Sequence, residues 1–174
     1  AFSSAIMVYG MSLLYGLLGT TSISEMGKQL MENPEKATTL LRVSVLFLLV
    51  GLGFKLAMVP FHTWLPDAME GGPTPVAAFI SVAPKAAGLA IVIRIFGEAF
   101  PLSKIQMTGI LSVLAIATMT FGNLMAIPQR NVKRLLAYSS IGHIGYILIG
   151  VIAANEFGAA GVMIYIIAYI FMNM

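Results

Sequence analysis

One lysine stands at the centre of a long apolar stretch. Lys85 lies midway along the stretch 74–96, which is long enough to cross a bilayer as one helix. A charged side chain at that depth costs roughly 2.5–3.5 kcal/mol on insertion scales, so it persists only against buried partners, water or other helices. A lysine near a helix end can extend its ammonium to the interface, but from mid-membrane depth this is much harder. We therefore expect Lys85 to be a proton site.

The residues around Lys85 favour proton exchange. Pro84 precedes it and leaves the carbonyl of Ile80 without its helical partner. The small residues 86–88 follow, and small side chains let a neighbouring helix or a file of water molecules approach closely. A carboxylate that moves toward or away from such a lysine would switch it between its charged and neutral forms.

A second lysine, Lys55, lies near the end of another apolar stretch, and two interpretations of it remain open. Pro60 and Pro66 both disfavour a continuous helix here. In the first interpretation a simple helix 39–58 is followed by a polar loop, and Lys55 extends to the interface. In the second, the helix is broken near Pro60 and resumes over 64–69, as in discontinuous helices that line ion sites at membrane depth. Lys55 then lies near the bilayer midplane.

A histidine occupies the middle of the apolar stretch 133–154. Ser139, His143 and Tyr146 are spaced i, i+4 and i+7, so they share one helical face, with Ser140 one step aside. Histidine titrates near physiological pH and can pass protons along such a polar stripe. The alternative is a histidine that only joins helices through hydrogen bonds.

Other kinds of chemistry have little support. His62 with Asp67 or Glu70 gives too few ligands for a metal shell, so we expect no metal site. The absence of cysteine excludes disulfides, thiolate-bound iron–sulfur clusters and c-type haem. There is no phosphate-binding loop and no nucleophile–base–acid arrangement. We expect no cofactor and no redox centre in this chain.

The composition indicates a membrane protein. Of the 174 residues, 59% are hydrophobic and 10% are charged, and the mean hydropathy is +0.92; soluble domains carry about 25% charged residues. The net charge is +3, but the basic residues are spread over connections and helices. They form no basic face, so nucleic-acid binding is not expected.

The apolar segments predict an all-α, polytopic transmembrane helix bundle that forms a single membrane domain over residues 1–174. The polar connection 20–38 has room for one surface helix. Both ends of the chain fall inside apolar runs, and the first run lacks the features of a signal peptide, so we expect an internal piece of a longer protein. The six segments are roughly 1–19, 39–60, 74–96, 105–127, 133–154 and 158–174.

Two blocks of sequence carry a family resemblance. VGLGFKLAMVPFHTWLPDAMEGGPTPVAAFISVAPKAAG and FGNLMAIPQRNVKRLLAYSSIGHIGYILIG closely resemble the antiporter-like membrane subunits of bacterial proton-pumping NADH:quinone oxidoreductase, respiratory complex I. Within this family, which includes multisubunit sodium/proton antiporters, they look most like subunit N. The match covers nearly the whole chain.

The resemblance implies a bundle of inverted five-helix repeats with one broken helix. Lys55 would match the lysine beside the break, whose charge is modulated by a glutamate on an earlier helix. Lys85 would match the central lysine that passes the proton onward, and His143 a histidine on the central polar axis. The glutamate is expected before Ala1, and the terminal lysine of the second half-channel beyond Met174.

The resemblance also implies the function and its setting. The chain would translocate protons as part of complex I in the bacterial inner membrane, among other membrane subunits, lipid and internal water. NADH, FMN, iron–sulfur clusters and quinone would be bound by partner subunits. Two alternatives remain: a cation/proton antiporter subunit that uses the same lysines without redox coupling, and a passive scaffold.

Overall fold

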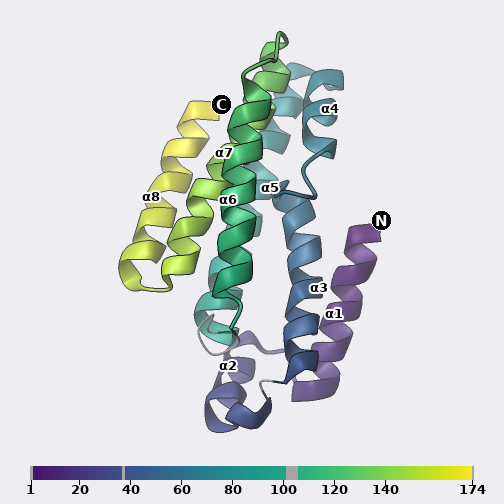
Figure 1. Ribbon diagram of the computed structural model, residues 1–174, viewed down its shortest axis with the longest axis vertical. Helices are drawn as coiled ribbons and strands as arrows, with labels where there is room; N and C mark the ends of the chain where they lie inside the picture. The colour runs from purple at the N-terminus through teal and green to yellow at the C-terminus, as the bar shows by residue number, and fades with distance from the viewer. Residues whose placement is uncertain (1, 37, 101–105, 174) are drawn as a thin grey trace.

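The computed structural model describes residues 2–36, 38–100 and 106–173, and all regular structure in these ranges is helical (Figure 1). This confirms the predicted all-α class. The elements are α1 (Phe2–Leu18), α2 (Ile23–Glu32), a 3₁₀ turn η1 (Pro34–Lys36), α3 (Thr39–Leu56), α4 (Trp64–Gly71), α5 (Thr74–Arg94) with a π-helical end η2 (Ile95–Ala99), α6 (Thr108–Ala126), α7 (Val132–Ala153) and α8 (Glu156–Asn173).

The predicted membrane-spanning segments correspond to long apolar helices. In the described ranges, five helices are long and apolar enough to cross a membrane: α3, α5 with η2, α6, α7 and α8. A sixth span is obtained if α1 and α2, which meet at 48°, are counted together. The outward faces are apolar as well, with Phe79, Ile116 and Ile164 exposed, as expected for helix faces that contact lipid.

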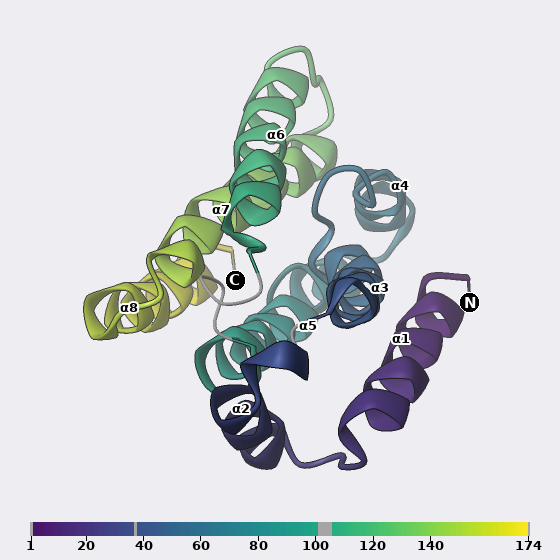
Figure 2. The same cartoon turned by 60° about the horizontal axis from the view of Figure 1, so that its bottom comes forward.

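The helices pack around α7. Figures 1 and 2 show α6 and α8 on either side of α7, with α1 against α3 on the opposite flank. Glycines let α6 and α7 approach closely: a Cβ on Gly122 would lie 2.5 Å from the backbone nitrogen of Gly142, and one on Gly145 would lie 2.7 Å from that of Met119. Close backbone approach at small residues is the usual packing mode of membrane helices. The fully buried Leu56 belongs to the core formed between these elements.

The polar connection forms a surface helix, as predicted. α2 lies across the end of α5, beyond the other helices in both views (Figures 1 and 2). Gly27 lies directly against the backbone carbonyl of Glu98, and Ser24 Oγ donates a hydrogen bond to the Glu98 carboxylate at 3.3 Å. Arg94 pairs with the same carboxylate at 3.5 Å. These contacts fix α2 to the π-helical end of α5.

The second apolar stretch is discontinuous, so the interpretation of a simple helix 39–58 is wrong. α3 ends at Leu56, Ala57 adopts a left-handed conformation with φ 56°, and the chain becomes helical again at Trp64. Other groups compensate for the interruption. The Val59 amide donates to Thr118 Oγ1 at 3.2 Å, and the Trp64 indole donates to the Phe54 carbonyl at 2.9 Å. The break is therefore held by side chains from α4 and α6.

Candidate functional site

Lys85 is buried in the middle of α5. Its side chain is 1% exposed, and it is the only buried charged residue in the part of the chain that the structure describes. The ammonium donates to Ser140 Oγ on α7 at 2.6 Å, and Ser140 Oγ donates in turn to the Ala137 carbonyl at 2.8 Å. Among the described residues no carboxylate pairs with Lys85. A proton on Lys85 therefore depends on nearby charge to compensate for burial.

The residue of α7 that contacts Lys85 is not one of the three that were predicted to share its polar face. The sequence pattern grouped Ser139 with His143 and Tyr146, but the structure places Ser140 against Lys85 and leaves Ser139 half-buried. The reason is that α7 packs against α4, α5, α6 and α8, and α5 contacts it at Ser140 while α8 contacts it at His143. The helical period alone does not say which side of α7 faces which neighbour.

His143 lies among three tyrosine rings. Its Nδ1 atom is 2.7 Å from the Tyr165 hydroxyl on α8. Ring centroids lie 5.6 Å from Tyr169, 5.8 Å from Tyr165 and 6.1 Å from Tyr146. Because Ser140 and His143 are three residues apart on α7, the Lys85 contact and the histidine cluster lie within one helical turn of each other. The structure therefore brings Lys85 and His143 to one region.

Lys55 lies apart from Lys85, at the end of α3. It is exposed, and it lines a pocket of about 280 Å³ whose other walls are Phe54, Trp64, Pro84, Ala87, Gly88 and Ile91. Ala87 and Gly88, which belong to the small residues predicted to let a neighbouring helix approach, thus line one side of this pocket. The pocket extends from Lys55 to the backbone beside Lys85. In the described ranges no carboxylate forms an ion pair with Lys55.

The α8 tyrosines are the part of the site that sequence reasoning missed. Tyr169 is buried, and its hydroxyl donates to the Ser81 carbonyl on α5 at 2.8 Å, one turn before Lys85. Tyr165 and Tyr169 are spaced i, i+4, which was the available signal. Both tyrosines lie in the apolar segment 158–174, which has no charged residue. The segment was therefore interpreted only as a membrane-spanning helix.

A polar cluster ties α4 to the start of α7. Arg134 Nη1 lies 2.7 Å from both Asp67 Oδ1 and Glu70 Oε2, and Asn131 Nδ2 donates to Glu70 Oε1 at 2.8 Å. The hydrogen bond from Arg134 lowers the pKa of the Glu70 carboxyl below its ordinary value. Asp67 and Glu70 thus face an arginine, and in the described residues no three His, Asp or Glu side chains gather as metal ligands.

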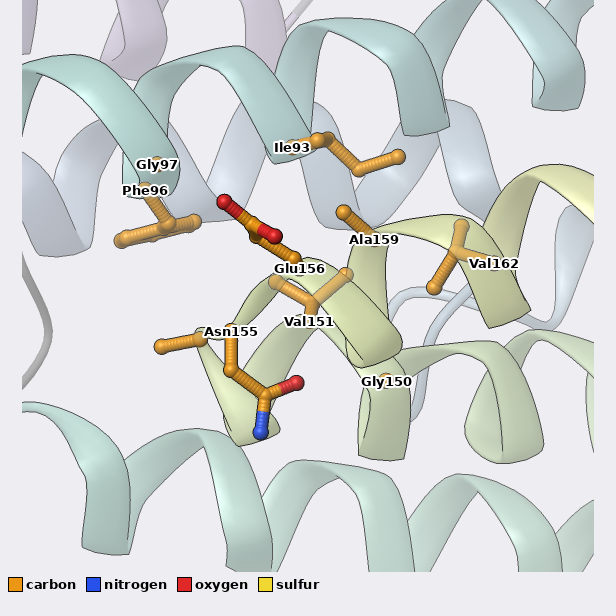
Figure 3. Close-up of a pocket in the computed structure, with 10 residues that line it drawn as sticks. Ile93, Phe96, Gly97, Gly150, Val151, Asn155, Glu156, Ala159 and Val162 are labelled. Atoms are coloured by element: carbon orange, nitrogen blue, oxygen red, sulfur yellow. The ribbon is translucent and has the colours of Figure 1, made fainter.

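A larger pocket lies at the opposite end of α7. Its volume is about 430 Å³, and Figure 3 shows it between the end of α5 and the turn from α7 to α8. Glu156 and Asn155 are its polar lining, while Phe96, Val151 and Val162 are apolar. None of the three predicted site residues lines it, so the ionisable groups of interest lie elsewhere.

Comparison with known proteins identifies the family. The family model described as NADH:quinone oxidoreductase/Mrp antiporter, TM matches residues 1–174. The chain belongs to this family. It is 48% identical over 172 residues to NADH-quinone oxidoreductase subunit N of Desulforamulus reducens, with 99% of this chain and 36% of the relative covered. It is 42% identical over 174 residues to subunit N of Trichlorobacter lovleyi, with 100% of this chain and 36% of the relative covered.

Solved structures show the same family fold. A chain of respiratory complex I from Thermus thermophilus matches with a TM-score of 0.76 and 35% identity, over 97% of this chain and 36% of that one. A chain of the Mrp complex from Dietzia sp. matches with a TM-score of 0.87 and 27% identity, over 97% and 30%. The predicted antiporter-like fold and family resemblance are thereby confirmed. This chain spans about a third of the length of the relatives and chains that it matches.

Proposed function

We propose that this chain is part of a subunit N of NADH:quinone oxidoreductase and that it moves protons through Lys55, Lys85 and His143. The observation that carries the proposal is the buried Lys85, whose ammonium has a single hydroxyl partner. An ionisable group at membrane depth is a functional site by default. The family match of the chain and its identity with subunit N relatives support the assignment to this complex.

The proposed route begins at Lys55. The pocket between Lys55 and the Pro84–Gly88 turn has a volume of about 280 Å³, and Lys55 is the charged residue that lines it. Water in this pocket would connect the Lys55 ammonium with the turn that carries Lys85. The proton would then pass from Lys85 toward α7, where Ser140 contacts the lysine and His143 follows one turn later.

The driving force in this proposal is electrostatic. Quinone reduction in a neighbouring subunit would separate Lys55 from the glutamate expected on an earlier helix. Two unit charges 4 Å apart interact by about 4 kcal/mol at an effective dielectric constant of 20. Loss of such a pair changes the field at Lys85 and releases its proton toward His143. No bond other than the proton's is made or broken in this chain, and redox cofactors would be bound by partner subunits.

The test is NADH-driven proton uptake by membrane vesicles that carry the full-length subunit with Lys85→Ala, normalised to assembled complex. We expect uptake and NADH oxidation to fall together while assembly stays normal. Lys28→Ala is the matched control, because Lys28 is an exposed lysine on α2, and it should leave both rates unchanged. Wild-type rates of both proton uptake and NADH oxidation per assembled complex in Lys85→Ala would mean that Lys85 is structural and that the chain acts as a scaffold.

A second candidate function is that of a cation/proton antiporter subunit. The TM-score of 0.87 with a chain of the Mrp complex favours it, and it would use the same lysines without redox coupling. The two functions differ in their energy source. Proton movement that depends on NADH and quinone supports the oxidoreductase, whereas sodium-dependent movement that ignores both supports the antiporter.

A further inference from the structure

Helix α8 contributes a tyrosine directly to the histidine of the proposed relay. The Tyr165 hydroxyl lies 2.7 Å from His143 Nδ1, and both side chains are partly buried. In the described part of the chain, the hydrogen-bond partner of the His143 ring is therefore the Tyr165 hydroxyl. A hydroxyl both donates and accepts, while an imidazole nitrogen does one or the other according to its protonation. The contact can therefore form with either charge state of His143.

The two charge states demand opposite orientations of the hydroxyl. When Nδ1 is bare, the Tyr165 O–H donates to it. When His143 is an imidazolium, Nδ1–H donates to the Tyr165 oxygen, and the hydroxyl proton points away toward another acceptor. An internal water molecule at this position would receive that proton.

We propose that Tyr165 is the onward proton partner of His143, an inference that rests on the proposed relay. The step starts from the neutral tautomer with the proton on Nδ1 and a bare Nε2, so that a proton arriving at Nε2 creates the imidazolium. Nδ1–H then passes its proton to the Tyr165 oxygen, as the hydroxyl proton leaves to an internal water molecule. His143 is then neutral with its proton on Nε2, Tyr165 remains neutral, and one proton has moved from Lys85 toward α8. A flip of the imidazole ring restores the starting tautomer before the next proton arrives.

The neighbouring tyrosines have other partners and provide matched controls. The Tyr169 hydroxyl donates to the Ser81 carbonyl at 2.8 Å, so it holds α8 to α5. The Tyr146 oxygen accepts from Asn123 Nδ2 at 2.7 Å, on the exposed side of α7. Both rings lie about as close to His143 as Tyr165 does, with centroids at 5.6 and 6.1 Å. In the described residues, neither the Tyr169 nor the Tyr146 hydroxyl forms a hydrogen bond with a ring nitrogen of His143.

The experiment compares Tyr165→Phe, Tyr169→Phe and Lys85→Ala in the full-length subunit within its complex. NADH-driven proton uptake by vesicles is measured in H₂O and D₂O and normalised to assembled complex. We expect Tyr165→Phe to lower uptake about tenfold, less than the usual 10²–10⁴ for a positioned proton-transfer group because water can partly replace it. We expect its solvent isotope effect to rise, because proton transfer at His143 becomes limiting. Tyr169→Phe removes a hydroxyl that donates to the Ser81 carbonyl and not to His143, so any loss of uptake should leave the isotope effect unchanged. Tyr15→Phe, at an exposed tyrosine on α1, should change neither uptake nor the isotope effect.

A second variant separates relay from hydrogen bonding. An amide at position 165, in Tyr165→Gln, keeps a hydrogen-bonding group for Nδ1 but cannot take up one proton while releasing another, so uptake should stay low. Recovery in Tyr165→Gln would overturn the inference, as would equal losses in Tyr165→Phe and Tyr169→Phe without a change in isotope effect. Normal uptake in Tyr165→Phe, with uptake lost in Lys85→Ala, would refute the role of Tyr165 and leave the relay standing. Normal uptake in Lys85→Ala would refute the relay itself.

Discussion

Replacing Ser140 with alanine should leave the buried Lys85 ammonium without its hydrogen-bond partner. The Lys85 side chain is 1% exposed, and Ser140 Oγ, at 2.6 Å, is the hydrogen-bond partner of its Nζ in the structure. A hydrogen bond to a charged group contributes about 1.5–3 kcal/mol, and a buried donor left without a partner costs a comparable amount. We therefore expect Ser140→Ala to lower the free energy of unfolding by about 2–3 kcal/mol.

A double-mutant cycle with Lys85→Met isolates this interaction. Methionine fills similar volume without a charge, and replacing a buried charge by an apolar group is often neutral or stabilising. In the Lys85→Met background Ser140 has lost its charged partner and keeps its bond to the Ala137 carbonyl, so Ser140→Ala should then cost less than about 1 kcal/mol. The expected coupling energy is about 1.5–2 kcal/mol.

The assay is equilibrium unfolding of the full-length subunit in mild detergent. Ser112→Ala is the matched control, because Ser112 Oγ donates to the Thr108 carbonyl within its own helix and has no lysine partner there. Its cost should be the same in both backgrounds. Additive effects of Ser140→Ala and Lys85→Met, within about 0.5 kcal/mol, would refute the reasoning that Ser140 satisfies the buried lysine.

Two further outcomes follow from the helix contacts. The hydrogen bond from Arg134 lowers the folded-state pKa of Glu70 from 4.5, so the contribution of Glu70 to the contact between α4 and α7 is fully present above that pH and is lost as the pH falls below it. The protection of α4 amides, measured against intrinsic exchange at each pH, should fall over this window, and Glu70→Gln should abolish the change. Gly122→Ala should lower the free energy of unfolding by about 1–3 kcal/mol through overpacking, since the new Cβ would lie 2.5 Å from the Gly142 backbone, whereas Gly109→Ala, which meets nothing within 4 Å, should not.

The helices were predictable, and Lys85 could be singled out as a candidate, because each rests on a strong local signal. Long apolar runs specify membrane helices, and a charge inside one of them identifies Lys85. Two prolines after Lys55 suggested a break, but the sequence alone left open a simple helix 39–58 followed by a polar loop. The structure decides between them because Thr118 and Trp64 bind the freed backbone groups, and Thr118 lies on a distant segment that no local pattern connects to the break.

The orientation of each helix was beyond the sequence pattern. A polar stripe on α7 was visible, yet its members divide between two neighbours, with Ser140 facing α5 and His143 facing α8. Tyr165 escaped notice because tyrosine is common in membrane helices, particularly at their interfaces. Its significance comes from a contact with a residue 22 positions earlier in the chain. Such contacts depend on how helices rotate against one another, which side-chain packing decides.

Helix α7 joins the separate parts of the candidate site. Its first turn binds α4 through Arg134, its middle contacts Lys85 through Ser140, and the next turn presents His143 to α8. Because a helix is stiff along its hydrogen-bonded axis, the contacts with α4, α5 and α8 keep a fixed spacing along α7. The ion pairs beside α4 and the contacts of Lys85 and His143 are therefore held in one register.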